Sequence, residues 1–119
     1  MKLIVAGSRT FDAYLFLEKS IFSFLSELKD KTSEIEIVSG EANGADKLGE
    51  EFAKRNQLKC TKFPADWDKY GKSAGYKRNV QMAEYADACI VFWDGISKGT
   101  QHMITIAKEH KLILKVIQF

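Results

Sequence analysis

The chain has 119 residues, of which 45% are hydrophobic and 29% are charged, as is typical of a soluble globular protein. This length is enough for one domain with its own core, and we expect a single domain over residues 1–119. A net charge of +2 is too small to indicate nucleic-acid binding on electrostatic grounds, and no apolar run approaches the roughly 20 residues of a membrane span.

Hydrophobic runs alternate with segments of helical periodicity along the chain. The apolar runs predict five strands, at residues 2–6, 34–39, 59–63, 88–93 and 112–117. The periodic segments predict four helices, from an N-cap at Asp12 to about Lys29, from Asn43 or Gly44 to about Asn56, over 76–85 and over 100–110. Strands that are apolar throughout are typical of a sheet covered on both faces. The pattern therefore predicts an α/β fold with a doubly wound, five-stranded parallel sheet.

The two cysteines, Cys60 and Cys89, lie in separate strand-like runs. They have no CxxC spacing, and His102 and His110 do not complete a zinc pattern. The N-terminal apolar run is too short for a signal peptide and is typical of a first strand. We therefore expect reduced structural thiols, no metal site, no cofactor and a cytoplasmic protein.

Three predicted strands end in glycines and small hydroxyl residues. The junctions read VAGSRT at 5–10, VSGEANGAD at 38–46 and FWDGISKGTQHM at 92–103. Free backbone N–H groups and a helix dipole at such junctions attract anions, above all phosphate. Because ligands of these sheets bind at the carboxyl ends of the strands, we expect the three junctions to share one phosphate-bearing ligand.

In the first junction, Gly7 permits a tight turn and close backbone approach to a ligand. Ser8 can donate a hydrogen bond, and Arg9 can bind phosphate through two hydrogen bonds. The alternative for Arg9 is an ordinary surface position beside a strand-to-helix turn.

In the second junction, Ser39 and Gly40 end the strand, and Gly44 lets the backbone approach a ligand. Asp46 either accepts a hydrogen bond from a ligand hydroxyl or simply interacts well with the helix dipole. Neither of the first two loops matches the GxGxxG dinucleotide fingerprint or the GxxxxGK[ST] phosphate loop. A standard NAD enzyme or P-loop NTPase is therefore disfavoured.

The third junction is the strongest candidate for a phosphate cradle. It combines an acid, two glycines, two hydroxyls and a cation: Asp94, Gly95, Ser97, Lys98, Gly99 and Thr100. Lys98 is alternatively a solvated loop residue. His102, in the first turn of the following helix, either faces the site or is a partly exposed helix residue.

Aromatic residues alternate with charged residues between Trp67 and Asn79. Trp67 or Tyr70 can stack on a base, or these rings only anchor the loop to the body of the protein. Arg78 and Asn79 begin the next helix, where they are suitably placed to reach a ligand.

The motifs GSR-x-F, SG-x-A-x-GAD, AD-W-x-x-YG-x-x-AG-x-x-RN-x-x-M and DG-x-S-x-GT resemble the YspA-like branch of the SLOG superfamily. This superfamily includes the DNA-processing protein DprA and the Lonely Guy phosphoribohydrolases. The resemblance spans Gly7 to Ala107. It implies a Rossmann-like three-layer sandwich and a nucleotide-type ligand site at the carboxyl ends of the strands.

Lonely Guy enzymes carry glutamates after their PGGxGT loop, whereas Gln101, His102 and Met103 follow Thr100 here. Glycosidic cleavage needs a carboxylate to stabilise positive charge or activate water. Hydrolysis by that route is therefore not expected unless Asp46, Asp94 or Glu41 substitutes from another loop. DprA-like proteins bind single-stranded DNA, which the small net charge here disfavours.

The sequence thus predicts binding, or sensing, of a phosphorylated nucleoside or nucleotide-derived ligand. The alternatives are a nucleotide-processing N-glycosidase or hydrolase, with Asp46, Asp94 or His102 as catalytic candidates, and a single-stranded nucleic-acid module. A homodimer is also expected. Apolar residues cover about half of the first helix, more than one sheet face requires, with the excess around Leu15 and Phe22 or around Phe24.

Overall fold

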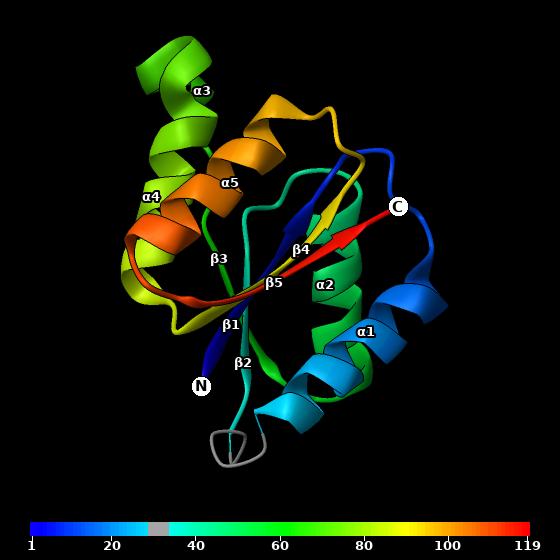
Figure 1. Cartoon of the computed structure of the whole chain (residues 1–119). Coiled ribbons are helices and arrows are strands. Elements are labelled where there is room, and N and C mark those ends of the chain that lie inside the picture. Colours follow the sequence, from blue (N-terminus) through cyan, green and yellow to red (C-terminus); the bar gives the residue numbers. More distant parts are fainter. Residues whose placement is uncertain (29–33) are drawn as a thin grey trace.

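The computed structural model describes residues 1–28 and 34–119. Five parallel strands form one sheet in the order β3-β2-β1-β4-β5, and helices cover both of its faces (Figure 1). The predicted α/β, Rossmann-like three-layer fold with a five-stranded parallel sheet is confirmed.

The chain alternates strands and helices almost throughout. The elements are β1 (Lys2–Gly7), α1 (Tyr14–Glu27), β2 (Glu36–Ser39), α2 (Ala45–Arg55), β3 (Lys59–Lys62), α3 (Trp67–Tyr70), the 3-10 turn η2 (Gly71–Ser73), α4 (Ala74–Tyr85), β4 (Ala88–Trp93), α5 (Lys98–Glu109) and β5 (Ile113–Gln118).

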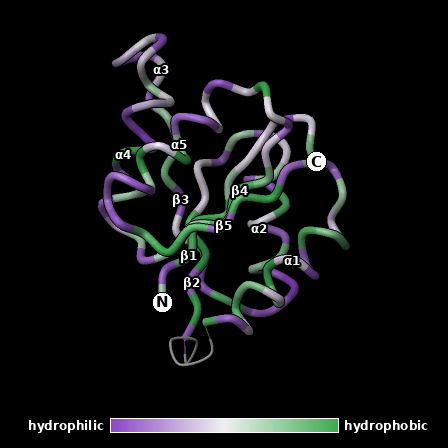
Figure 2. Tube along the Cα trace, in the orientation of Figure 1, coloured by the Kyte–Doolittle hydropathy of each residue, from purple (hydrophilic) through white to green (hydrophobic). Residues whose placement is uncertain are grey.

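The two faces of the sheet have separate hydrophobic cores. Leu3 and Val5 pack with the buried residues of α1 and α2, whereas Ile4 and Ala6 pack with those of α4 and α5. This division follows from the two-residue period of a strand, which sends neighbouring side chains to opposite faces. Figure 2 shows hydrophobic residues concentrated along the strands and hydrophilic residues on the outer sides of the helices.

The strand order places a switch point between β1 and β4. The chain moves outward from β1 through β2 to β3, then returns to build β4 and β5 on the other side of β1. At the carboxyl ends, Gly7 is in register with Phe92. The loops that follow β1 and β4 therefore start side by side, where ligands of such sheets bind.

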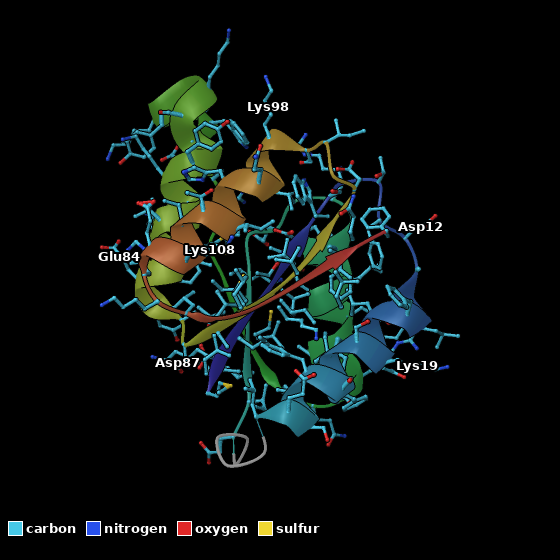
Figure 3. The ribbon with its side chains drawn as sticks, viewed as in Figure 1. Asp12, Lys19, Glu84, Asp87, Lys98 and Lys108 are labelled. Atoms are coloured by element: carbon cyan, nitrogen blue, oxygen red, sulfur yellow. The ribbon has the colours of Figure 1, made fainter. Side chains whose placement is uncertain are left out.

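The predicted N-cap of the first helix is wrong. α1 begins at Tyr14 after Ala13, which makes no side-chain cap, and Asp12 is exposed on the preceding loop (Figure 3). Phe11 is buried and stacks on Phe92 with ring centroids 4.8 Å apart, so the helix starts only after this anchor. The predicted end near Lys29 lies outside the described residues.

The segment after Pro64 contains a short helix that the sequence pattern did not predict. Asp66 caps α3 by accepting a hydrogen bond from the backbone N–H of Lys69 at 3.1 Å. Gly71, with φ of 56°, ends the helix after Tyr70. The turn η2 then leads into α4, which begins two residues before its predicted start.

Candidate functional site

Hydrogen bonds join the three glycine-containing junctions. The backbone N–H of Ser8 donates to the carbonyl of Phe92 at 2.8 Å, and its hydroxyl accepts from the N–H of Asp94 at 3.1 Å. On the other side, the N–H of Ala45 donates to the carbonyl of Ser8 at 3.4 Å. The first junction thus lies between the other two, and all three meet at the carboxyl edge of the sheet.

Gly44 makes this contact between loops feasible. Its φ is +81°, and a Cβ there would lie 2.3 Å from the carbonyl oxygen of Ser8 and 2.7 Å from the Cα of Arg9. A larger residue would push the first two junctions apart and would be strained at this backbone angle. Gly44 therefore packs against the first junction instead of facing a ligand.

Two adjoining hollows open at this edge. The inner hollow, about 80 Å³, is lined by Ala6, Gly7, Arg9, Ala42, Asp46, Arg78, Asn79, Ser97, Gly99, Thr100 and Met103. The outer hollow, about 300 Å³, is lined by Arg9, Gly40, Glu41, Ala42, Lys47, Pro64, Ala65, Trp67 and Arg78. Because Arg9, Ala42 and Arg78 line both, the two hollows are neighbouring parts of one site.

Asp46, in the first turn of α2, is the buried acid of the inner hollow, with only 4% of its surface exposed. Burial raises its pKa to about 6, although the charge of Arg78 and hydrogen bonds from the backbone N–H groups of Ala42, Gly7 and Gly40 act in the opposite direction. The carboxylate therefore holds the first two loops together and changes charge in a mildly acidic range.

Arg78, in α4, is fixed in place by its neighbours. Its Nη1 donates to the carbonyl of Gly40, and its Nε donates to Oδ1 of Asn79 at 3.1 Å. Burial lowers its pKa, the charge of Asp46 opposes this shift, and the charge of Arg9 adds to it. Arg9 is exposed, so a half-buried, hydrogen-bonded guanidinium and an exposed one border the same inner hollow.

The N-terminus of α5 supplies the third wall of the inner hollow. The Asp94 carboxylate accepts from the N–H groups of Ile96 and Ser97, both at 2.8 Å, and these bonds lower its pKa. The Ser97 hydroxyl caps the helix by accepting from the N–H of Thr100 at 3.4 Å. The helix thus starts at Lys98, two residues before the predicted start at Thr100, because Ser97 is its N-cap.

The first turn of α5 leaves donors available for a ligand. Within residues 1–28 and 34–119, the backbone N–H groups of Lys98 and Gly99 have no hydrogen-bond partner. The side chain of Lys98 points away from the sheet (Figure 3) and does not line either hollow. The backbone at this turn, rather than the lysine ammonium, is therefore the group that can meet an anion.

Asn79 links α4 to α5. Its Nδ2 donates to the carbonyl of Gly99 at 3.2 Å and lies 3.1 Å from Nδ1 of His102. As Nδ2 is a donor, Nδ1 of the imidazole accepts and the ring proton resides on Nε2. Burial lowers the pKa of His102, and the ring packs on Tyr76 with centroids 4.3 Å apart, outside the lining of both hollows.

The two candidate stacking residues differ in their surroundings. Trp67 is 51% exposed and lines the outer hollow. Tyr70 lies beneath the ammonium groups of Lys69 and Lys77, which are 5.1 Å and 4.9 Å from its ring centroid. It lines a third depression of about 160 Å³, which shares Pro64 and Arg78 with the outer hollow but does not include Trp67.

Most of the predicted ligand-binding residues line the two hollows. Those that do are Gly7, Arg9, Gly40, Asp46, Trp67, Arg78, Asn79, Ser97, Gly99 and Thr100. Tyr70 and Lys98 line neither hollow. The remaining five shape the loops by hydrogen bonds or by a positive φ: Ser8, Ser39, Gly44, Asp94 and Gly95. Ser39, for example, donates its hydroxyl hydrogen to Glu50 at 2.7 Å.

Other lining residues were not singled out by sequence reasoning, and most of them are small or apolar. They are Ala6, Ala42, Pro64, Ala65, Met103 and the charged Lys47, whereas Glu41, which also lines the outer hollow, is one of the acids considered above for hydrolysis. The position of Ala42 inside the glycine-containing second loop was the only signal for any of them, since alanine and proline carry no distinguishing chemistry.

Two larger depressions lie elsewhere on the molecule. One, about 370 Å³, runs along α2 and β3 and is lined by paired lysines and glutamates. The other, about 530 Å³, lies at the amino ends of the strands around Met1 and Asp87. Neither brings together two arginines and a helix N-terminus, so the carboxyl edge is the better candidate site.

None of the helices within residues 1–28 and 34–119 is long and apolar enough to cross a membrane. Within the same ranges, no group of three histidine, cysteine, aspartate or glutamate side chains is arranged to hold a metal ion. Cys60 and Cys89 are both free thiols.

The fold and the site define a Rossmann-like α/β protein whose glycine-containing loops meet at the switch point of the sheet. Residues 1–70 match the model of the YspA, cpYpsA-related SLOG family, and the chain belongs to this family, as the sequence motifs predicted. Family membership indicates nucleotide-related binding or processing. The match ends before Arg78 and α5.

The chain is also similar to the gene 61 protein of Mycobacterium phage D29. The two sequences are 36% identical over 89 residues, which cover 70% of each chain.

Proposed function

We propose that this chain is a cytoplasmic protein that binds, and thereby senses, a phosphorylated nucleoside or another nucleotide-derived ligand at the carboxyl edge of its sheet. The observation that carries the proposal is that Arg9 and Arg78 line one inner hollow together with the N-terminus of α5. Two guanidiniums and free helix N–H groups form a site for a dianion such as phosphate.

The remaining groups of the inner hollow fit the sugar of such a ligand. Asp46 and Asn79 offer a carboxylate and an amide, which can accept and donate hydrogen bonds to hydroxyl groups. Thr100 adds a hydroxyl in the first turn of α5. A phosphate at the arginines with a sugar above Asp46 satisfies both the cationic and the anionic parts of the hollow.

A thermal-shift panel with phosphate, ribose 5-phosphate, adenosine and AMP tests the proposal. A compound present at about 100 times its dissociation constant stabilises the fold by roughly 2.7 kcal/mol. We expect phosphorylated compounds to raise the melting temperature of the wild type and adenosine to have a much smaller effect. The proposal fails if no phosphorylated compound stabilises the protein.

Arginine variants show whether the rise in melting temperature comes from binding at the inner hollow. Arg9→Ala should abolish most of the shift without loss of stability, because Arg9 is exposed. Arg78→Ala should abolish the shift and also lower the free energy of unfolding by about 1.5–3 kcal/mol, since charge-assisted bonds to Gly40 and Asn79 are lost. Arg55→Ala is the matched control, because this exposed arginine on α2 lines neither hollow and contacts Glu51 at 2.9 Å and the ring of Tyr14 at 4.2 Å. An unchanged shift in Arg9→Ala would contradict the site.

The alternative is an N-glycosidase or nucleotide hydrolase, and the pKa of Asp46 favours it. An acid with a pKa of about 6 can exchange a proton near neutral pH. Against it, Gln101, His102 and Met103 occupy the positions after the loop where a carboxylate would be needed. Release of free base from AMP that is lost in Asp46→Asn would support the enzyme.

We also propose that the chain forms a homodimer through α1. Leu15, Phe16 and Phe22 are 68%, 46% and 48% exposed, whereas Phe24 is buried in the core. The unsatisfied apolar surface of α1 therefore lies around Leu15 and Phe22. A second copy of this helix would remove that surface from water.

A further inference from the structure

The outer hollow differs chemically from the inner one. Pro64, Ala65 and Trp67 give it an apolar wall, and Arg9 and Arg78 border it on the side of the inner hollow. A Cβ on Gly75 would lie 3.5 Å from Cη2 of Trp67 and 3.6 Å from Nη2 of Arg78. The tip of the indole and the guanidinium therefore both lie next to one glycine, close enough for one ligand to touch both.

The indole ring of Trp67 is exposed and makes no aromatic or cation–π contact with the rest of the described chain. It is 51% exposed, and no aromatic or cationic partner covers its face within residues 1–28 and 34–119. The other tryptophan, Trp93, is engaged, because its Nε1 donates to the carbonyl of Ser97 at 3.1 Å. Tyr70 lies beneath two lysine ammonium groups. Trp67 is thus the aromatic residue available to a ligand.

The two hollows differ in volume, so each of them fits a different part of a ligand. The inner hollow, about 80 Å³, is well below the roughly 300 Å³ at which small-molecule pockets begin, so it suits a phosphate group better than a whole nucleoside. The outer hollow, about 300 Å³, is at the lower end of the range for small-molecule pockets. A molecule with its phosphate inside and a planar ring outside would occupy both.

We propose that the outer hollow is the subsite for an aromatic base, which stacks on Trp67 while the phosphate of the same molecule binds between Arg9 and Arg78. This inference rests on the proposed function and narrows it: the ligand is a base-bearing nucleotide and not a sugar phosphate. Glu41 and Lys47 line the same hollow and offer an acceptor and a donor to the edge of the base.

The test compares AMP with ribose 5-phosphate, which lacks the base, by calorimetric titration. Stacking of one base on an aromatic ring corresponds to roughly 5- to 150-fold in affinity. We expect wild type to bind AMP more tightly than ribose 5-phosphate by a factor in this range. Trp67→Ala should remove that difference and leave the affinity for ribose 5-phosphate unchanged, whereas Trp67→Phe should retain most of it.

Tyr70→Ala is the matched control, since Tyr70 is the neighbouring aromatic residue on the same short helix. It should leave both affinities near their wild-type values. Selective loss of AMP affinity in Tyr70→Ala, with none in Trp67→Ala, would overturn the assignment of the base to Trp67.

Other outcomes separate this inference from the proposed function. If AMP and ribose 5-phosphate bind equally to wild type and both depend on Arg9, the anion site stands and the base subsite is wrong. If neither compound binds, the proposed function and the base subsite both fail. Circular dichroism of each variant checks that the fold is retained, which we expect for a side chain as exposed as Trp67.

Discussion

At the residue scale, Asp46 combines a structural and a chemical property. Its carboxylate accepts hydrogen bonds from the backbone of the first two loops, yet it lies in the hollow that we propose for an anion. An ionised Asp46 repels a bound dianion, whereas a protonated one can donate a hydrogen bond to it. The charge of the site therefore depends on the proton of Asp46.

We predict that sulfate binds more tightly as the pH falls through about 6. The pKa of Asp46 is raised from 3.8 to about 6, so the side chain is ionised at pH 7.5 and largely neutral at pH 5. Sulfate is the probe because its own charge does not change in this range. Titrations at pH 5, 6 and 7.5 should show a rising affinity towards acid in wild type and a much flatter profile in Asp46→Asn.

His102→Gln is the control for this pH dependence, because burial lowers the pKa of His102 and its protonation would also add positive charge near α5. Of the other ionisable groups around Asp46, the two arginines stay charged throughout. If His102→Gln flattens the profile and Asp46→Asn does not, the assignment to Asp46 is wrong.

The site residues that could be predicted are those whose chemistry shows in the sequence. Arg9, Arg78 and Gly99 stand in glycine-containing or basic motifs at strand and helix ends. The role of Ser39 could not be read in this way, because Glu50 on α2 takes its hydroxyl hydrogen. Which partner a hydroxyl finds is decided by packing between distant elements.

At the element scale, the start of α5 supplies the unpaired backbone N–H groups of the proposed anion site. Its cap, the Asp94 turn and the bond from Asn79 fix this first turn from three directions. A rigid turn with unpaired N–H groups loses little conformational entropy when an anion binds. We therefore expect a larger side chain in the first turn of α5 to lower the affinity for an anion more than it lowers the stability of the fold.

We predict opposite effects for two glycine substitutions. A Cβ on Gly99 would meet no atom within 4 Å, so Gly99→Ala should leave stability unchanged or raise it by up to about 1 kcal/mol. A Cβ on Gly44 would collide with Ser8 and Arg9, so Gly44→Ala should destabilise the fold by more than that. Urea unfolding of both variants checks these signs.

Phosphate affinity gives a second test of Gly99, separate from stability. Phosphate affinity should fall in Gly99→Ala although its fold is intact, because the methyl group occupies the approach to the helix N–H groups. Full affinity in a stable Gly99→Ala would show that the anion does not approach α5 at this turn.

Helices and strands could be predicted where their periodic patterns were long. The hydrophobic run Ala88–Trp93 gave the bounds of β4, and the apolar spacing gave α2 within about two residues. α3 has only four residues, too few for a helical period, and its cap at Asp66 resembles any loop aspartate. Short elements depend on local hydrogen bonds that a hydrophobicity pattern does not contain.

At the scale of the whole molecule, the exposed face of α1 determines how copies of the chain meet. We predict a dimer in solution and a monomer for the double variant Leu15→Glu with Phe22→Glu. Leu15 is 68% exposed and Phe22 is 48% exposed with its ring 5.2 Å from that of Phe52, so charge there should disrupt association, and circular dichroism checks that the double variant keeps its fold. Sedimentation velocity over a concentration series measures this, and Lys108→Glu is the control, because this exposed residue lies on α5, on the other face of the sheet (Figure 3).

A wild-type chain that remains monomeric at high concentration would contradict the dimer. A double variant that still dimerises would place the interface on another face of the molecule.

The strand order was the largest part of the fold that the sequence left open. Alternation of strands and helices predicts a parallel sheet, but many orders of five strands satisfy it. The order determines which junctions are neighbours. Because β4 returns to the side of β1 opposite β2, Arg9, Asp46 and Arg78 come together.

Because of the same switch point, a ligand bound in the inner hollow would hold the two halves of the sheet together. Arg9 and Asp46 come from the first half of the chain, while Arg78 and Gly99 come from the second, so a ligand of the inner hollow bridges the seam between β1 and β4. Opening of that seam would dismantle the site, and binding must therefore oppose it. Backbone amides along Val5, Ala6 and Val91 would exchange their hydrogens more slowly when the site is filled, with a smaller change at the outer strand β3.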